Sequence, residues 1–202
     1  MTHPKQTNNR RQEPIILASK SPRRKELLEQ AGLVLEILAS EIDETAIPLA
    51  GPKDYVQQLS QLKAEHIGKI RPDTWIIGAD TIVVVDDAIL GKPKSREESV
   101  QMLGTLNNRA HSVFTGFTIY CHARKLSITN AIETTVIFKH LSQNEINWYA
   151  STNEPYDKAG GYGIQGIGAF LVRKICGSYS NVVGLPVCEV METLSSFDIV
   201  RF

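Results

Sequence analysis

The sequence predicts an α/β fold, because short apolar runs of strand character alternate with segments of helical periodicity. The apolar run at residues 15–18 is followed at once by helix-capping residues. A helical stripe over residues 53–69 precedes the buried-strand pattern of residues 75–85. Residues 111–138 hold two strand-like runs joined by a polar turn. These observations indicate one chain that mixes strands and helices.

The composition is that of an ordinary globular protein, and it narrows the function classes. Of 202 residues, 42% are hydrophobic and 22% are charged, and 22 basic residues balance 22 acidic ones. A net charge of zero gives no whole-chain attraction to nucleic acid or to an anionic membrane, so we expect neither partner. The length suits one large domain or two closely joined lobes. We expect a disordered N-terminal tail over residues 1–14 and a single domain over residues 15–202.

The cysteines and the N-terminus bear on the compartment. Cys121, Cys176 and Cys188 are far apart and form no CxxC pair, which disfavours a disulfide framework or a zinc knuckle. No apolar run approaches the roughly 20 residues of a membrane span. Residues 1–11 lack the apolar core of a signal peptide. We therefore expect a cytoplasmic protein.

The helix that follows the first strand carries an unfavourable charge in its first turn. Ser21 is a good N-cap, and Pro22 suits the first helical position. Arg23 and Arg24 then lie where the helix dipole favours carboxylates, which costs stability unless an anion is bound. A strand, a turn and a helix N-terminus form an anion site, and guanidinium groups bind phosphate in a bidentate manner. We predict a phosphate site here; the alternative is that both arginines are solvated surface residues.

Three carboxylates within four residues follow the next short apolar run, at residues 34–38. Glu41, Asp43 and Glu44 precede a loop that contains proline and glycine. Such a cluster is either a solvated loop or, beside a polyphosphate, a group that holds a divalent cation through its oxygens. The sequence leaves both interpretations open.

The helical stripe over residues 53–69 has a lysine on its inward face. Val56, Leu59 and Ile70 share the stripe with Lys63. A lysine in such a position either extends to the solvent at the edge of the core or points into a cleft, where it can meet a phosphate. Both possibilities stay open at this point.

The segment from Trp75 to Thr81 has the pattern of a buried strand that ends in an acid, Asp80, and residues 82–85 form a second apolar run. A carboxylate there is costly unless it is paired, bound to a metal or solvated at a cleft. The neighbouring Gly78 would let a ligand approach closely. Asp80 is our candidate catalytic carboxylate; the alternative is an acid that caps a neighbouring loop.

The elements of the second half are mainly structural. Capping boxes, in which a serine N-cap precedes a glutamate by three residues, open helices at Ser95 and Ser142. Between them, residues 111–121 and 128–138 alternate as the strands of a hairpin. Gly116 marks a bulge or a close approach in the first of these strands.

The Gly-rich loop, residues 154–166, contains a GxGxxG pattern that we do not interpret as a dinucleotide site. No strand precedes its glycines, and a strand-like segment, residues 169–175, follows them. We interpret the segment as a flexible loop whose Tyr and Gln tips cover a nucleobase. The amide of Gln165 can donate and accept hydrogen bonds at once, which suits the edge of a base. A last helix is predicted over residues 186–194.

Taken in order, these motifs resemble the Maf family of nucleoside-triphosphate pyrophosphatases. The resemblance extends from about Ile15 to Leu194 and rests on SKSPRR (19–24), IDET (42–45), LKAE (62–65), GADTIV (78–83), ILGKP (89–93), HSVFTG (111–116), EPYDKAGGYGIQG (154–166) and NVVGLP (181–186). It implies a long, curved, mixed sheet flanked by helices, with two lobes around a central cleft, similar to inosine-triphosphate pyrophosphatases.

The resemblance also implies an activity. It is hydrolysis of the α–β phosphoanhydride of a nucleoside triphosphate, with a divalent cation such as Mg²⁺ or Mn²⁺, in a house-cleaning or division-arrest role. The IQG form of the Gly-rich loop resembles the branch that acts on dTTP and UTP. Two alternatives stay open: the same chemistry on 7-methyl-GTP, and a non-catalytic nucleotide-binding regulator of septum formation. By analogy, a homodimer is possible.

Position by position, the resemblance assigns roles to eight residues. It makes Asp80 the proton acceptor that activates water, and it places the metal at Glu44 and Asp80. The implied triphosphate ligands are Arg23, Arg24, Lys63 and Lys92, and the positions associated with base choice are Arg23, Thr81 and Gln165.

Overall fold

The computed structural model describes residues 11–44 and 51–201, and within them a seven-stranded mixed sheet forms the centre of the fold. Its strands are β2 (Ile15–Leu17), β3 (Glu36–Ile37), β4 (Trp75–Val85), β5 (Ala88–Leu90), β6 (Ala110–Cys121), β7 (Leu126–Phe138) and β8 (Val172–Cys176). The order is β3-β2-β4-β6-β7-β8, and β5 pairs with β4. β2 is parallel to both of its neighbours, whereas the other pairs are antiparallel.

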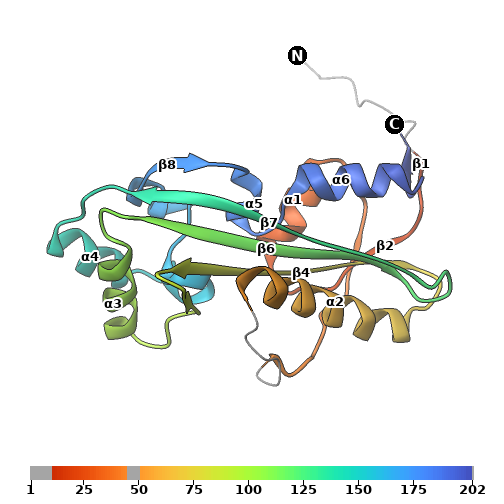
Figure 1. Ribbon diagram of the computed structural model, residues 1–202, viewed down its shortest axis with the longest axis horizontal. Helices are drawn as coiled ribbons and strands as arrows, with labels where there is room; N and C mark the ends of the chain where they lie inside the picture. The colour runs from red at the N-terminus through yellow and green to blue at the C-terminus, as the bar shows by residue number, and fades with distance from the viewer. Residues whose placement is uncertain (1–10, 45–50, 202) are drawn as a thin grey trace, which may run out of the picture.

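Helices cover both faces of this sheet. They are α1 (Pro22–Gln30), α2 (Pro52–Ile70), α3 (Arg96–Leu106), α4 (Gln143–Ala150), α5 (Tyr179–Val183) and α6 (Val187–Ser196). Figure 1 shows α1 and α6 on one side of the long strands, α2 on the other side, and α3 and α4 at the far end of the molecule. The α/β fold predicted from the sequence is therefore confirmed. In the part of the chain that the structure describes, none of these helices is long and apolar enough to span a bilayer.

The helix starts follow the predicted capping residues, with one difference. The Ser21 side chain accepts a hydrogen bond from the Arg24 backbone at the start of α1. Ser142 opens α4 with a complete capping box. At α3 the box is only half formed, because the Glu98 carboxylate accepts a hydrogen bond from the backbone of Lys94 rather than of the N-cap.

Within the described residues, one face of the sheet supports two separate hydrophobic cores. The first surrounds Trp75 and Phe117 and is covered by α1 and α6. The second surrounds Val83 and Phe138 and is covered by α3 and α4. Trp75 and Val83 are eight residues apart in one strand, so their side chains point to the same face. The two cores correspond to the two lobes predicted from the sequence.

The edge of β4 that faces β2 and β5 is open in its middle. Among the described strands, β2 pairs with β4 only as far as Ile77, and β5 pairs with it only from Val83 onward. Asp80 and Thr81 lie in the interval between these two short partners. The prediction that the strand ends near Asp80 was therefore wrong, because β4 continues without a break to Val85. Asp80 is accessible since a neighbouring strand is missing, not because its own strand stops.

Two glycines let α2 pack its backbone directly on the sheet. A Cβ atom added to Gly78 would lie 2.1 Å from the carbonyl oxygen of Ser60, and one added to Gly116 would lie 2.2 Å from that of Val56. The predicted close approach at Gly116 is confirmed. Gly78, however, makes room for a helix rather than for a ligand. This close packing brings Lys63 of α2 next to Asp80.

The same close packing changes the inward face of α2. Val56 and Leu59 are buried as predicted, but Ile70 is 56% exposed. The small residues Ser60 and Ala64 are fully buried on the inward face. A helix that lies this close to a sheet has room only for short side chains at the contact.

The predicted disordered tail is wrong for residues 11–14, while residues 1–10 lie outside the described residues. β1 (Arg11–Gln12) pairs with β9 (Val200–Arg201). The carboxylate of Glu13 accepts a hydrogen bond from the indole of Trp75 at 3.2 Å. These contacts attach the segment to the first core.

The second core contains a buried histidine. His111 is 4% exposed, and its Nε2 atom lies 2.6 Å from the hydroxyl of Tyr162. Both rings meet Phe138 edge to face, with centroids 5.0 Å and 4.7 Å from its own. Burial lowers the pKa of His111 to about 4. The imidazole is therefore neutral at pH 7 and stays neutral in mild acid.

We expect His111 to make the fold acid-sensitive. In the unfolded chain the imidazole takes up a proton near its ordinary pKa of 6.5, whereas the folded protein does so only near pH 4. The free energy of unfolding keeps its full value above pH 6.5. It falls by about 3 kcal/mol as the pH drops to 4, at about 1.36 kcal/mol per pH unit. Urea unfolding at pH 7 and pH 5 should show that wild type loses about 2 kcal/mol more than His111→Gln does. Equal losses in the two proteins would contradict this explanation.

Candidate active site

A cleft of about 710 Å³ opens where the edge of β4 is unpaired. Its walls come from α1, α2, β4, the segment after β5 and the Gly-rich loop. All eight residues predicted for the site line it: Arg23, Arg24, Glu44, Lys63, Asp80, Thr81, Lys92 and Gln165. The fold thus gathers these residues in one place, while their roles in binding and catalysis stay predictions.

Asp80 and Lys63 form the centre of the cleft together with Glu44. The ammonium of Lys63 lies 2.7 Å from a carboxylate oxygen of Asp80 and 2.7 Å from one of Glu44. The Lys63 and Asp80 side chains are only 11% and 13% exposed. Of the two possibilities for Lys63, the structure has the one in which it points into a cleft. Its partners are carboxylates, so one cation holds two acids together.

Neighbouring residues of β4 serve opposite faces of the sheet. Asp80 is in register with Gly116 and points toward α2, where Lys63 meets it. Thr81 points the other way, and its hydroxyl lies 2.9 Å from that of its register partner, Thr115. The open edge therefore exposes a carboxylate on one face and a hydroxyl on the other.

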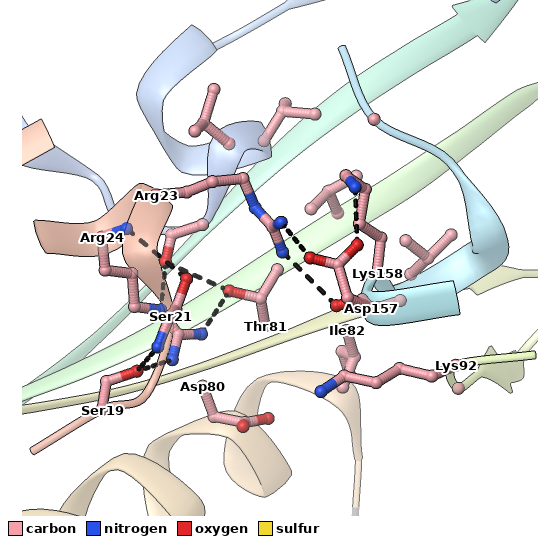
Figure 2. A pocket seen from close by; sticks show the side chains of 18 of the residues that line it. Ser19, Ser21, Arg23, Arg24, Asp80, Thr81, Ile82, Lys92, Asp157 and Lys158 are labelled. Carbon is pink, nitrogen blue, oxygen red and sulfur yellow. Dashed lines mark hydrogen bonds and ion pairs between the residues drawn. The ribbon is translucent and has the colours of Figure 1, made fainter. Parts of the chain in front are cut away.

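Arg24 is buried and binds the protein itself. Its guanidinium donates to the carbonyl oxygens of Gly184 (2.8 Å) and Ala79 (2.9 Å). It also donates to the hydroxyls of Ser19 (3.1 Å) and Thr81 (3.0 Å), as Figure 2 shows. With 9% exposure, Arg24 is not a solvated surface residue. Four of the five donors of a guanidinium are thereby used within the chain.

The charge of Arg24 is balanced by acids on the other side of β4. Burial lowers the pKa of Arg24, the nearby Asp80 carboxylate raises it, and the Glu44 carboxylate acts in the same direction as Asp80. The buried guanidinium and the candidate catalytic acid are therefore electrostatically coupled across the strand.

Arg23 has a different partner, which the sequence did not suggest. One terminal nitrogen donates to the carboxylate of Asp157 at 2.6 Å, and the other donates to the backbone oxygen of that residue at 3.4 Å. Lys158 binds the second carboxylate oxygen at 2.6 Å (Figure 2). Burial alone would raise the pKa of Asp157, but the hydrogen bonds from Lys158 and Arg23 hold it below its usual value. An Asp-Lys pair inside the Gly-rich loop was the signal available in the sequence.

The Gly-rich loop differs from the prediction at both of its tyrosines. Tyr162 is 5% exposed and packs into the second core, and the Tyr156 hydroxyl donates to the backbone oxygen of Ala150 at 2.6 Å, outside the residues that line the cleft. Gln165, in contrast, is exposed and lines the cleft. The Glu154 carboxylate fixes the end of the loop by accepting hydrogen bonds from the backbone of Ile167 (2.9 Å) and Gly168 (2.7 Å).

Positive charge predominates in the walls of the cleft. Among the described residues that line it, seven side chains are cationic and three are carboxylates, an excess of four positive charges. The cations are Lys20, Arg23, Arg24, Lys63, Lys92, Lys94 and Lys158, and the acids are Glu44, Asp80 and Asp157. The whole chain is neutral, so this excess is local and suits a small polyanion.

Comparison with known proteins gives the same family over most of the chain. The family model described as Maf-like protein matches residues 14–197. The dTTP/UTP pyrophosphatase of Syntrophus aciditrophicus is 46% identical over 190 residues, 94% of this chain and 93% of that protein. Those of Desulfotalea psychrophila and Bacillus pumilus are 47% and 46% identical, each over 93% of this chain and over 96% and 98% of their own lengths.

Among solved structures, the Ham1 protein of Staphylococcus aureus is similar at a TM-score of 0.46 and 15% identity, over 79% of this chain and 80% of that one. A likeness of this size adds nothing to the assignment, which the sequence comparisons carry. The extent of the family match and the identity to these relatives show that the chain belongs to the Maf-like protein family.

Proposed function

We propose that this protein is a hydrolase of acid anhydrides, a pyrophosphatase that converts dTTP and UTP to the monophosphate and pyrophosphate. The single observation that carries the proposal is the cationic cleft built around Asp80 at the open edge of β4. The relatives described as dTTP/UTP pyrophosphatases support the choice of substrate.

The charge of the cleft matches that of the substrate. A nucleoside triphosphate carries about four negative charges, which repel an incoming hydroxide and must be stabilised on the leaving pyrophosphate. Lys92 and Lys94 lie on the segment after β5 and line the cleft. Lys63 lines the same cleft from α2. Cations from several segments around one cleft can bind a triphosphate along its length.

Asp80 is the group placed to activate water. Its carboxylate is 13% exposed, so it reaches the cleft while most of the side chain is shielded. The Lys63 ammonium lies 2.7 Å from it and orients the carboxylate in the cleft, where it can accept a proton. We propose that Asp80 takes the proton of the water that attacks the α-phosphate.

The residues beside Asp80 fit a divalent cation. Glu44 and Asp80 each place a carboxylate oxygen 2.7 Å from the ammonium of Lys63. The two acids therefore converge beside one positive charge. Oxygen ligands suit Mg²⁺ or Mn²⁺, which commonly bind one or two carboxylates together with substrate phosphates. Within residues 11–44 and 51–201 no group of three or more such ligands is found, so phosphate oxygens would complete the shell. A bound cation would supply charge neutralisation at the phosphates.

The products of dTTP distinguish the proposed reaction from its alternatives. With dTTP and Mg²⁺, we expect dTMP and pyrophosphate in equal amounts, separated by ion-exchange chromatography, and no activity when the metal is chelated. Orthophosphate with dTDP would exclude cleavage at the α–β bond. A panel with UTP, dCTP, dATP and 7-methyl-GTP tests the base. Nucleotide binding without any product across that panel would point instead to a non-catalytic regulator.

A further inference from the structure

The cleft contains one acid that the proposed reaction does not use. Asp157 ends the short 3-10 turn Pro155–Asp157 in the Gly-rich loop. It holds Arg23 through two different acceptors, its carboxylate at 2.6 Å and its backbone oxygen at 3.4 Å. Because both terminal nitrogens of the guanidinium are engaged by one residue, the plane and the direction of the Arg23 side chain are fixed.

This ion pair joins parts of the cleft that are far apart in the chain. Arg23 lies in the first turn of α1, and Asp157 lies 134 residues later. The Arg23 side chain is 23% exposed and that of Asp157 is 56% exposed, so only the arginine is largely shielded from water. Two hydrogen bonds to one residue fix the orientation of the guanidinium, even though the pair adds little to the stability of the fold.

The link extends from Asp157 to the segment around Gln165. Lys158 donates to the free carboxylate oxygen of Asp157 (2.6 Å) and to the backbone oxygen of Glu154 (2.7 Å). The Glu154 carboxylate in turn accepts the backbone N–H of Gly168 at 2.7 Å. Hydrogen bonds through Asp157, Lys158 and Glu154 therefore connect α1 to Gly168, three residues after Gln165.

The position of the pair separates it from the reacting end of the cleft. The Gly-rich loop lies over Val83, since a Cβ added to Gly160 would be 3.0 Å from that side chain. Val83 and Thr81 point to the same face of β4, whereas Asp80 points to the other face, toward α2. A nucleotide whose α-phosphate lies at Asp80 would thus extend its sugar and base toward the face that carries the Gly-rich loop.

Resting on the proposed function, we infer that Asp157 is a positioning residue for substrate selection. It holds Arg23 against the Gly-rich loop, so that Arg23 and Gln165 together face the pyrimidine and the sugar of the nucleotide. Asp157 takes one N–H of each terminal nitrogen and leaves the second N–H of each for the substrate. Because its plane is fixed beside the Gly-rich loop, Arg23 serves the nucleoside end of the substrate.

The test compares Asp157→Asn with wild type on dTTP and dCTP. The asparagine keeps the size of the side chain but loses the charge that fixes Arg23. We expect the ratio of kcat/KM for dTTP to that for dCTP to fall roughly tenfold, as befits the loss of a charge-assisted hydrogen bond. The change should fall on KM more than on kcat. Asp87→Asn, at an exposed turn outside the cleft, is the matched control and should leave the ratio unchanged.

Arg23→Lys and the double variant establish whether Asp157 acts through Arg23. We expect Arg23→Lys to lower the ratio similarly, and the double variant to be no less selective than either single one. Additive losses would overturn the inference. So would an unchanged ratio in Asp157→Asn, or tighter binding of both nucleotides in that variant, which would make Asp157 a competitor of the phosphates. If Asp157→Asn does not fold, Arg23→Lys tests selectivity by itself.

Binding measurements separate this inference from the proposed function. The α,β-methylene analogues of dTTP and dCTP resist hydrolysis, so their dissociation constants by calorimetry report selection alone. A wild type that prefers the dTTP analogue but yields no product would overturn the pyrophosphatase proposal. Loss of that preference in Asp157→Asn would still support the inference, whereas its retention would overturn it.

Discussion

Asp80→Asn should lower the turnover of dTTP about a thousandfold or more, while the nucleotide still binds. A positioned general base contributes roughly 10²–10⁴ in rate, and an amide of the same size cannot take the proton. Lys63 and Lys92 remain in the variant to bind the phosphates. Pyrophosphate release under single-turnover conditions measures the first effect, and calorimetry with the α,β-methylene analogue of dTTP measures the second.

The control for this variant addresses the electrostatic role of Asp80 in the fold. Asp80 balances the charges of Lys63 and Arg24, so part of any loss could come from altered packing. Thermal unfolding of Asp80→Asn, beside Asp73→Asn at an exposed turn, shows whether the variant is folded at the assay temperature. A folded Asp80→Asn protein with wild-type turnover would remove Asp80 from the role of proton acceptor.

Arg24→Met should lower the free energy of unfolding by about 3–5 kcal/mol, the size found when one partner of a buried charge network is removed. The change leaves the carbonyl oxygen of Ala79 without its donor and that of Gly184 with only the Thr81 hydroxyl at 3.3 Å, and a buried acceptor that lacks a donor costs about 1–3 kcal/mol. It also deprives Asp80 of a nearby positive charge. Equilibrium urea unfolding of the two proteins at pH 7 measures the difference.

The neighbouring arginine is the matched control. Arg23→Met removes a side chain of the same kind from the same helical turn, but its ion pair with Asp157 is partly exposed. Such pairs contribute up to about 1 kcal/mol. Equal destabilisation by the two variants would show that the bonds of Arg24 to β4 do not stabilise the fold in the way that the structure suggests.

Local chemistry was enough to predict the elements but not the partners of the two arginines. Ser21 and Pro22 specify the start of α1 whatever surrounds it, and the helix begins there. Two arginines in the first turn of α1 led to the prediction of a bound anion. The answer depends on Gly184 and Asp157, which lie more than 130 residues further along the chain. No local pattern carries that information.

The strand that holds Asp80 shows a second limit of sequence reasoning. A carboxylate in an apolar run looks like the end of a strand, because a paired interior position would bury its charge. The prediction of an accessible acid agreed with the structure, but the position within the strand was wrong. Access depends on how far β2 and β5 extend beside β4, which is a property of two other segments. Ile70 was misplaced as well, because it is the last residue of α2 and is 56% exposed there.

Asp80 is reached through the interval between β2 and β5, so the lengths of these two strands determine whether the protein can react. Continuing β5 by two or three residues beyond Leu90 would extend its pairing with β4 past Val83 and close the edge from which Asp80 is reached. Such an extension would abolish activity while Asp80 and Lys63 stayed in place. The guanidinium of Arg24 donates to the carbonyl oxygen of Ala79 at this open edge. It therefore occupies a backbone acceptor with which a longer neighbouring strand would otherwise pair.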